Sequence, residues 1–313
     1  MSGRSLFTGG KVGILAGGPS SEREISLKSG QAVKRAFEAA GIDSVLIDAA
    51  ERDLLDVIRK ENVDVAFIAL HGKFGEDGAV QELLSGAGIP YTGSGPEASR
   101  TALDKLASKE MFRKAGLLVP EFRSVAYGQD TDNALRDAKV PCVVKPRYEG
   151  SSIGLTVVRH REELAQAVEK GLKFGGEVLV EEYIPGRELT VGVLEEKALP
   201  VVEITVSGGV YDYDSKYRSQ STVYKVPAEI GKDNFERAQE AGIAAHKALG
   251  CRGFSRTDIR MTSDGRLYVL EVNTIPGLTE KSLLPMAAKA AGFDFELLCV
   301  KMLESASNGR VKR

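Results

Sequence analysis

The first 70 residues alternate short apolar runs with amphipathic stretches, and this alternation restricts the fold more than any other feature of the sequence. Three runs predict buried strands: KVGILAGG (11–18), SVLIDA (44–49) and VDVAFIAL (63–70). Between them we expect a helix that ends near Ala40 and a second helix around 53–61. Ser21 and Glu24 predict a capping box for the first helix, and Gly41 follows it as a stop signal. This order of elements predicts a parallel sheet covered by helices.

Ligands of such a sheet usually lie beyond the carboxyl ends of its strands. Here those ends carry glycines 17–18 and His71. The glycine pair lacks the full GxGxxG pattern, so a dinucleotide-binding dehydrogenase is disfavoured.

The rest of the chain mixes strands and helices, so the predicted fold class is α/β with α+β character in the C-terminal parts. A single amphipathic helix is expected over 99–116. After it we expect strands at 121–127, 141–146, 155–159 and 177–184, with a helix near 161–173. The last part is expected to hold strands at 187–195 and 199–206, a polar loop 207–227 and a helix 232–249. A hairpin 254–273 and two terminal helices complete the predicted order. Boundaries near 97 and 184 predict three domains: 1–97, 98–184 and 185–313.

Composition and charge exclude several classes of protein. The 313 residues carry a formal net charge of −2, which gives no electrostatic case for a nucleic acid or an anionic membrane as partner. The longest apolar run, VAFIAL, is too short to span a bilayer, and MSGRSLFTGG lacks the apolar core of a secretory signal. Cys142, Cys251 and Cys299 show no CxxC spacing, which argues against a disulfide framework or a zinc site and favours a cytoplasmic protein.

A small, flexible loop follows a lysine in KPRYEGSSIG, residues 145–154. Such a loop lets backbone N–H groups approach a phosphate, but it is also what a plain turn between two strands looks like. The strand LTVV comes next, whereas a Walker loop or a dinucleotide fingerprint would lead into a helix. A protein kinase is excluded because the sequence has no HRD or DFG. The loop alone leaves the class open.

A hairpin is predicted by SRTDIRMTSDGRLYVLEVN, residues 255–273, with Asp264-Gly265 as a two-residue turn. In that register the apolar face pairs Thr257 with Val272, Ile259 with Leu270, and Met261 with Tyr268. The polar face pairs Asp258 with Glu271, and Arg256 with Asn273.

Two carboxylates that face each other across a hairpin have Cβ atoms about 5 Å apart and should repel. Mg²⁺ would compensate, because it binds carboxylates and completes its shell with water and substrate phosphates, and Asn273 offers another oxygen on the same face. The alternative is a solvated polar face that Arg256 and Arg260 neutralise. The phosphate loop favours the metal, and together these features predict ATP as a substrate.

The loop TIPGLTEKS (274–282) follows the hairpin, and its backbone and Ser282 offer contacts for a small polar substrate. The alternative is an ordinary connector in which Ser282 caps a helix over 282–291. The residues alone leave both interpretations open.

Five motifs, in this order, resemble the D-alanine–D-alanine ligases, a family in the ATP-grasp group of carboxylate–amine ligases. They are LAGGPSSEREISLKSG, ALHGKFGEDGAVQ, YTGSG, ALGCRGFSRTDI and LEVNTIPGLTEKSLLPMAA. The resemblance covers almost the whole chain, and only a short N-terminal extension and a polar C-terminal tail depart from it. It implies an N-terminal parallel-sheet substrate domain followed by a two-part ATP-grasp fold.

The resemblance also implies which residues bind ATP and metal. Lys105 and Lys145 would contact the phosphates beneath the loop residues Glu149, Gly150, Ser151 and Ser152. The adenosine would lie against Glu181, Glu182, Tyr183, Ile184 and Glu188. Two Mg²⁺ ions, for which Mn²⁺ can substitute, would be held by Asp258, Glu271 and Asn273.

A second set of residues is implied for the two D-alanines. Glu22 would bind the ammonium of the first, oriented by Ser151 and Tyr217 and with His71 nearby. Arg256 and the Gly277 N–H would stabilise the oxyanion of the tetrahedral intermediate. Ser282 and Lys216 would hold the carboxylate of the second D-alanine.

The implied reaction joins two D-alanines for peptidoglycan synthesis and releases ADP and phosphate. The carboxylate of the first D-alanine attacks the γ-phosphate of ATP, and the amine of the second D-alanine attacks the resulting acylphosphate. A lid at 207–227 would exclude water. The family also implies a homodimer. The rival interpretations are another ATP-grasp ligase, such as one that makes D-alanyl-D-lactate, and a non-catalytic nucleotide-binding regulator. A regulator should have lost phosphate lysines or metal ligands, and this chain retains them.

Overall fold

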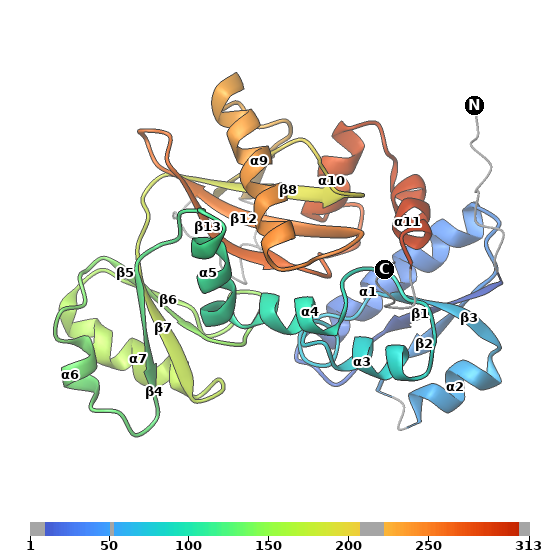
Figure 1. Ribbon diagram of the computed structural model, residues 1–313, viewed down its shortest axis with the longest axis horizontal. Coiled ribbons are helices and arrows are strands. Elements are labelled where there is room, and N and C mark those ends of the chain that lie inside the picture. Colours follow the sequence, from blue (N-terminus) through green and yellow to red (C-terminus); the bar gives the residue numbers. More distant parts are fainter. Residues whose placement is uncertain (1–9, 51–52, 207–221, 307–313) are drawn as a thin grey trace.

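The predicted parallel sheet forms the N-terminal part of the chain (Figure 1). The structure is a computed structural model that describes residues 10–50, 53–206 and 222–306. Its first sheet has the strand order β2-β1-β3, and both pairs are parallel. The strands are β1 (Lys11–Ala16), β2 (Ser44–Asp48) and β3 (Val63–Ile68), with helices α1 (Arg23–Ala39), α2 (Leu54–Lys60) and α3 (Ala79–Gly86). The strand–helix alternation therefore predicted this part of the fold correctly.

The predicted capping box of α1 is wrong. The helix begins at Arg23, and its N-cap residue Glu22 makes no side-chain capping hydrogen bond. The Glu22 N–H instead donates to the Ser20 hydroxyl at 3.1 Å, and that hydroxyl donates to the carbonyl of His71 at 2.6 Å. The chain is thus held to the end of β3, which leaves the Glu22 side chain for other contacts. The predicted stop is confirmed, since Gly41 adopts φ 70°.

The single helix predicted over 99–116 is two helices, α4 (Pro96–Leu103) and α5 (Lys105–Lys114). The break falls at Asp104, whose extended backbone lets its carboxylate accept hydrogen bonds from the N–H groups of Leu106 and Ala107. The same carboxylate pairs with the Arg147 guanidinium, with Nε at 2.7 Å. The break places Lys105 at the first position of α5, beside the loop that follows Lys145.

An antiparallel four-stranded sheet with the order β4-β7-β5-β6 forms the central part of the chain, drawn in green in Figure 1. Its strands are β4 (Phe122–Ala126), β5 (Cys142–Pro146), β6 (Thr156–Val158) and β7 (Glu177–Glu182). Helix α7 (Leu164–Leu172), which follows the 3-10 turn Arg161–Glu163, packs on it, and the short helix α6 (Thr131–Leu135), which the sequence analysis missed, contributes Leu135 to the same apolar core. The phosphate loop lies between β5 and β6, as predicted.

The third sheet has six strands, with the order β11-β10-β8-β12-β13 and β9 paired to β8. They are β8 (Arg187–Leu194), β9 (Lys197–Ala198), β10 (Val202–Val206), β11 (Thr222–Lys225), β12 (Phe254–Met261) and β13 (Leu267–Asn273). The loop predicted at 207–227 is therefore partly wrong, because Thr222–Lys225 is a strand paired with β10. Residues 207–221 of that prediction lie outside the described part of the chain.

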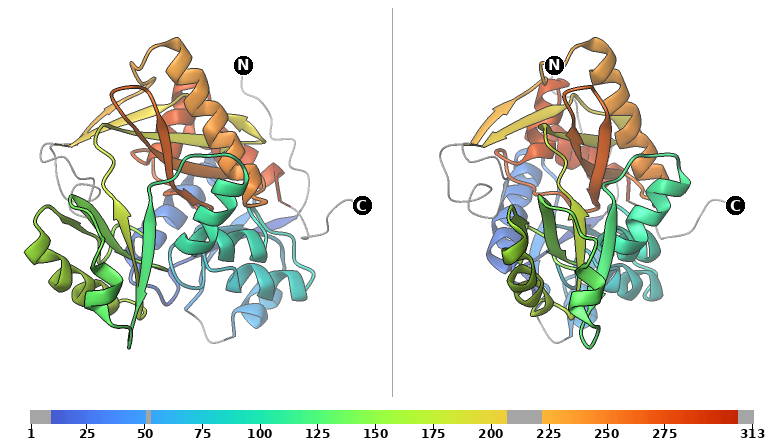
Figure 2. Two further views of the ribbon diagram at one scale, coloured as in Figure 1. Left: turned by 60° about the vertical axis from the view of Figure 1, so that its left-hand side comes forward. Right: turned by 90° about the vertical axis from the view of Figure 1, so that its left-hand side faces the viewer.

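Two helices cover opposite faces of the six-stranded sheet. A Cβ added to Gly242 of α9 (Lys232–Ala248) would lie 2.6 Å from Val191, and one added to Gly192 would lie 2.6 Å from Leu284 of α10 (Leu283–Ala290). Since consecutive strand residues point to opposite faces, α9 and α10 pack on different sides. Figure 2 shows α9 along the outside of this sheet in both views.

The predicted hairpin register is correct at one end and wrong at the other. Asp258 faces Glu271 and Thr257 faces Val272, as predicted. Nearer the turn, Ile259 faces Val269 and not Leu270, and Met261 faces Leu267 and not Tyr268. The physical reason is a pair of compensating irregularities. The turn is one residue longer than the predicted two-residue turn, with Gly265 at φ 80° and the Thr262 N–H bonded to the Arg266 carbonyl, and a bulge at Leu270 restores the register.

The first and last parts of the chain share one apolar core. Helix α11 (Phe295–Glu304) packs against α1, and Leu298 and Met302 lie in the same buried cluster as Phe37 and Phe67. The rings of Phe37 and Phe67 meet edge to face, with centroids 5.4 Å apart. In the described residues no helix is long and apolar enough to cross a membrane. The three cysteines are unpaired and buried.

Candidate active site

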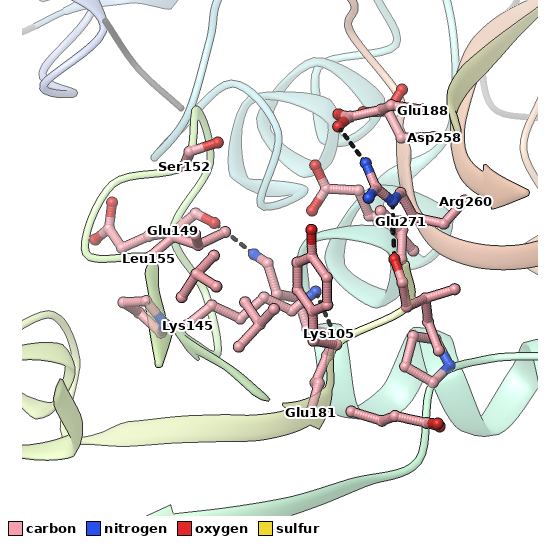
Figure 3. Close-up of a pocket in the computed structure, with 18 of the residues that line it drawn as sticks. Lys105, Lys145, Glu149, Ser152, Leu155, Glu181, Glu188, Asp258, Arg260 and Glu271 are labelled. Carbon is pink, nitrogen blue, oxygen red and sulfur yellow. Dashed lines mark hydrogen bonds and ion pairs between the residues drawn. The ribbon is translucent and has the colours of Figure 1, made fainter. Parts of the chain in front are cut away.

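A pocket lies between the four-stranded and the six-stranded sheets, and Figure 3 shows the side chains that converge on it. Its walls come from the start of α5, strands β5, β6, β7, β8, β12 and β13, and the loop after β5. The predicted residues that line it are Lys105, Lys145, Glu149, Ser152, Glu181, Glu182, Tyr183, Ile184, Glu188, Asp258 and Glu271. Val143, Leu155, Val157 and Leu270 add apolar surface that suits a flat ring. Residues that are far apart in the sequence therefore share one cavity.

Two lysines of this pocket are buried and bind oxygen atoms of the protein. The Lys145 ammonium lies 3.0 Å from Oε2 of Glu181, and both side chains are almost inaccessible to solvent. The Lys105 ammonium donates to the carbonyl of Glu149 in the phosphate loop. Burial lowers the pKa of Lys105 and, in the loop, raises that of Glu149. Two ammonium groups therefore lie where little water reaches them, which suits phosphate.

The loop after β5 contains a hydrogen-bonded turn, in which the Ile153 N–H donates to the Gly150 carbonyl at 3.0 Å. Ser151 and Ser152 both have positive φ angles, 49° and 58°, which non-glycine residues adopt rarely and at a cost. The Ser151 hydroxyl donates a hydrogen bond to the Glu22 carboxylate at the start of α1. Gly150 lies against the same carboxylate, since an added Cβ would be 3.3 Å from Oε2 of Glu22. The loop therefore connects the pocket to the N-terminal part.

On the hairpin, Asp258 is surrounded by hydrogen-bond donors. It accepts two hydrogen bonds of 2.8 Å from the Arg256 guanidinium and one of 2.8 Å from the Thr190 hydroxyl, while the Asn273 amide lies at 3.3 Å. Arg260 binds Glu188 at 3.1 Å instead of a hairpin acid. Part of the alternative interpretation therefore holds, because an arginine neutralises Asp258. Over residues 10–50, 53–206 and 222–306 there is no group of three or more His, Cys, Asp or Glu side chains that could hold a metal.

His71 is buried at the end of β3 and contacts the loop after the hairpin. Its Nε2 lies 3.1 Å from the Ser29 hydroxyl, and its Nδ1 lies 3.2 Å from the carbonyl of Ile275. Burial lowers the pKa of His71 to about 4, so the ring is neutral at pH 7. A neutral ring with one N–H fits these two contacts and holds the N-terminal part against residues 274–282.

Glu76 was missed by the sequence analysis although it lies within the HGKFGEDGAVQ motif. Its Oε2 accepts a hydrogen bond of 2.6 Å from the N–H of Gly72. Burial, and then the neighbouring charge of Glu22, raise the pKa of Glu76 well above its ordinary range. The spacing of this motif gives no sign that Glu76 and Glu22 lie close enough for their charges to interact, because Glu22 comes from another element.

The loop after the hairpin brings Gly277 and Ser282 together. A Cβ on Gly277 would lie 3.0 Å from the Ser282 hydroxyl. Ser282 is the N-cap residue of α10, as predicted, but its hydroxyl does not cap that helix; it accepts a hydrogen bond of 3.1 Å from the N–H of Thr279. Lys216 and Tyr217 lie outside the described residues.

The arrangement of the sheets defines the class of protein. A four-stranded and a six-stranded sheet that enclose a pocket, after a parallel-sheet domain, form the ATP-grasp architecture of the solved structures that the chain matches. The structure of D-alanine–D-alanine ligase from Bacillus anthracis complexed with ATP has a TM-score of 0.84 and 33% sequence identity, over 95% of this chain and 97% of that chain. The D-Ala:D-Ser ligase VanG from Enterococcus faecalis has a TM-score of 0.81 and 31% identity, over 94% and 98%.

Sequence comparison gives the family. The D-alanine–D-alanine ligase from Geotalea uraniireducens is 46% identical over 297 residues, which cover 95% of this chain and 96% of that protein. The ligase from Aromatoleum aromaticum is also 46% identical, over 96% of this chain and 97% of that protein. Family models described as D-ala D-ala ligase C-terminus and N-terminus match residues 111–304 and 51–94. The chain belongs to the D-alanine–D-alanine ligase family.

Proposed function

We propose that the chain joins two D-alanines to D-alanyl-D-alanine at the expense of ATP, through an acylphosphate, for peptidoglycan synthesis. Full-length relatives of this activity support the assignment. The observation that carries it on this chain is the hydrogen bond from Ser151 to Glu22. It puts an acid of the N-terminal part at the edge of the loop that borders the ATP pocket, where an amino acid must lie to receive a phosphoryl group.

ATP is proposed to occupy the pocket between the sheets. The adenine would lie in the apolar part beside Tyr183 and Ile184, with Glu181, Glu182 and Glu188 as polar partners of the adenosine. The phosphates would extend toward Lys105 and Lys145 beneath Glu149, Gly150, Ser151 and Ser152. The desolvated ammonium groups bind phosphate strongly because little water competes with them.

The metal ligands are proposed to be Asp258, Glu271 and Asn273. They fit Mg²⁺ in donor chemistry, since all three offer hard oxygen atoms on one hairpin face, and both acids line the pocket. Mn²⁺ suits the same oxygens. A bound ion would neutralise charge on the transferred phosphoryl group. Arg256 and Thr190 hold the Asp258 carboxylate in a fixed orientation with hydrogen bonds of 2.8 Å.

The amino-acid substrates would lie between the phosphate loop and the N-terminal part. Glu22 would bind the ammonium of the first D-alanine, oriented by Ser151 and Tyr217, and His71 would keep the adjoining loop in place. The first carboxylate would then attack the γ-phosphate. The second D-alanine would be held through its carboxylate by Ser282 and Lys216, with its amine facing the acylphosphate.

Attack of that amine creates an oxyanion, which needs preorganised donors. Arg256 is suited to this task because its guanidinium carries five N–H groups and two hydrogen bonds of 2.8 Å to Asp258 fix its orientation. The Gly277 N–H would be the second donor. Residues 207–227 would close the site and keep water from the acylphosphate.

We further propose the division of the chain at residues 97 and 184, a cytoplasmic location and a homodimer. The division is supported by the sheets, because the four-stranded sheet lies between Phe122 and Glu182. Family membership supports the location and the dimer.

The test is phosphate release and product analysis with the purified chain, ATP and MgCl₂. D-alanine should support turnover and yield D-alanyl-D-alanine, whereas L-alanine should not. D-serine is the relevant second acceptor, because the VanG ligase of similar fold is a D-Ala:D-Ser ligase. A dominant mixed product from equal concentrations of D-alanine and D-serine would replace the assignment, and ATP hydrolysis independent of any D-amino acid would overturn it.

A further inference from the structure

Lys109 is a fully buried lysine directly behind the pocket, and none of the roles above uses it. It lies four residues after Lys105 in α5, its side chain is 0% exposed, and it is absent from the pocket lining. Its ammonium is 3.1 Å from Oε1 of Glu181, the carboxylate whose other oxygen pairs with Lys145. Among the described residues, neither Nζ of Lys109 nor Oε1 of Glu181 has another hydrogen-bond partner that could replace this ion pair.

Lys109, Glu181 and Lys145 form a buried row of three charged side chains, with the carboxylate between the two ammonium groups. An isolated buried charge is strongly disfavoured, so each member depends on its neighbours. Burial alone would raise the pKa of Glu181, but the charges of Lys109 and Lys145 outweigh it and leave that pKa below its ordinary range. Burial lowers the pKa of Lys109 to about 8, against the opposing effect of Glu181. The ring of Phe122 lies 5.9 Å from its ammonium and adds a weak cation–π contact.

Only two members of this row line the pocket, Lys145 and Glu181. When Lys145 turns from Glu181 to a phosphate, Glu181 would remain as a buried anion if nothing else neutralised it. Lys109 supplies a second positive charge both when Lys145 pairs with Glu181 and when Lys145 pairs with a phosphate, so the Glu181 carboxylate is never left unpaired. The same charge also weakens the hold of Glu181 on Lys145, because the two ammonium groups share one carboxylate.

We propose that Lys109 is a positioning residue for nucleotide binding: it holds Glu181 ionised and in place, so that Lys145 can exchange its carboxylate partner for a phosphate of the nucleotide. This inference rests on the proposed ATP site. The competing explanation is a buried ion pair that contributes only to stability. The two differ in what should happen when Glu181 is neutralised as well.

The experiment measures the dissociation constant of ATP by calorimetry in MgCl₂ without D-alanine, on the full chain. Lys109→Met should weaken ATP binding at least about tenfold, because Glu181 then pairs with Lys145 alone and competes with phosphate. In steady-state assays the KM for ATP should rise with little change in the KM for D-alanine. Lys109→Arg, which keeps the charge, should stay within about threefold of the unmutated protein. The matched control is Lys114→Met, the same change at an exposed position of the same helix.

The decisive variant is Lys109→Met combined with Glu181→Gln. It removes both charges of the pair, so it should bind ATP as tightly as Glu181→Gln alone, the variant in which any adenosine contact of Glu181 is changed in the same way. Because this double variant leaves no unpaired acid, it also serves where Lys109→Met does not fold. ATP binding by Lys109→Met equal to that of Lys114→Met, or a double variant weaker than Glu181→Gln, overturns the inference. Failure of the unmutated chain to bind ATP would instead overturn the proposed function.

Discussion

The Ser151 hydroxyl, in the loop after β5, donates a hydrogen bond to the Glu22 carboxylate at the start of α1, 129 positions earlier in the sequence. Ser151 and its neighbour Ser152 both have a left-handed backbone, with φ 49° and 58°. Such residues persist only where the surrounding structure holds them. The hydrogen bond therefore fixes the phosphate loop over the site that we assign to the first D-alanine, and couples the nucleotide pocket to the N-terminal part.

Ser151→Ala should weaken use of the first D-alanine while ATP binding changes little. The lost hydrogen bond has a charged acceptor, for which about 1.5–3 kcal/mol is typical, so the KM for the first D-alanine should rise by roughly one to two decades. Ser151→Gly removes the same hydroxyl but suits the positive φ, so it should be more stable than Ser151→Ala by about 1 kcal/mol. D-alanine saturation curves and urea unfolding measure the two effects. Equal KM values for Ser151→Ala and the unmutated chain would disprove the role of the hydrogen bond.

The two hairpin acids should respond differently to neutralisation, although both are proposed metal ligands. Glu271→Gln should lose most ligase activity and leave the stability of the ligand-free protein unchanged or slightly raised, since it relieves repulsion from Asp258. Asp258→Asn should lose activity and also stability, by about 1–3 kcal/mol, because the partly buried Arg256 loses its carboxylate partner. Turnover as a function of MgCl₂ and urea unfolding test this pair. Near-normal turnover of Glu271→Gln at limiting Mg²⁺ would contradict the metal assignment.

The hairpin shows what the sequence could predict. Alternation placed Asp258 opposite Glu271 correctly, although the pairs nearer the turn were shifted by one residue. The turn around Gly265 is one residue longer than the Asp-Gly signal indicates, and the bulge at Leu270 compensates for it. Both irregularities are set by packing: the bulge lets Leu270 line the pocket while Val269 stays in the core. Local patterns do not contain that information.

Other features depended on contacts between distant segments. Periodicity predicted one helix over 99–116, and nothing in it shows that Asp104 would break the helix to cap α5 and bind Arg147. Lys109 was indistinguishable from any lysine of an amphipathic helix until Glu181 was placed beside it. The motif residues themselves were recognised from the resemblance, whereas composition and charge only excluded several classes of protein.

Two buried histidines should make the protein sensitive to acid. Burial lowers the pKa of both His71 and His246 to about 4, below the ordinary value of about 6.5. The folded state favours the neutral rings, so the unfolded chain takes up protons first as the pH falls. The contribution of the two rings to the free energy of unfolding is therefore complete above pH 6.5 and is lost as the pH falls from 6.5 toward 4. Each ring accounts for about 3 kcal/mol of the free energy of unfolding by this linkage.

The pH dependence is tested by urea unfolding at intervals from pH 7.5 to pH 4.5. His246→Gln should flatten the loss of stability in this window, because Gln cannot take up a proton, even if it lowers the stability at neutral pH. His160 is exposed, so His160→Gln is the matched control and should leave the profile unchanged. A profile for His246→Gln as steep as that of the control would rule out this histidine as a source of acid sensitivity.

Gly277→Ala should affect the second D-alanine more than the first. The backbone at Gly277 does not have the positive φ that excludes a side chain, but the new Cβ would lie 3.0 Å from the Ser282 hydroxyl. That contact is tighter than van der Waals packing allows, so Ser282 must shift by a few tenths of an ångström away from the position in which it is proposed to hold the second carboxylate. A misplaced positioning group reduces reaction efficiency strongly. We expect about a tenfold rise in the KM for the second D-alanine, with ATP binding unchanged. Initial rates over a wide range of D-alanine concentration separate the two substrate sites, and calorimetry with ATP supplies the control. An unaltered second KM would mean that Ser282 does not hold this substrate.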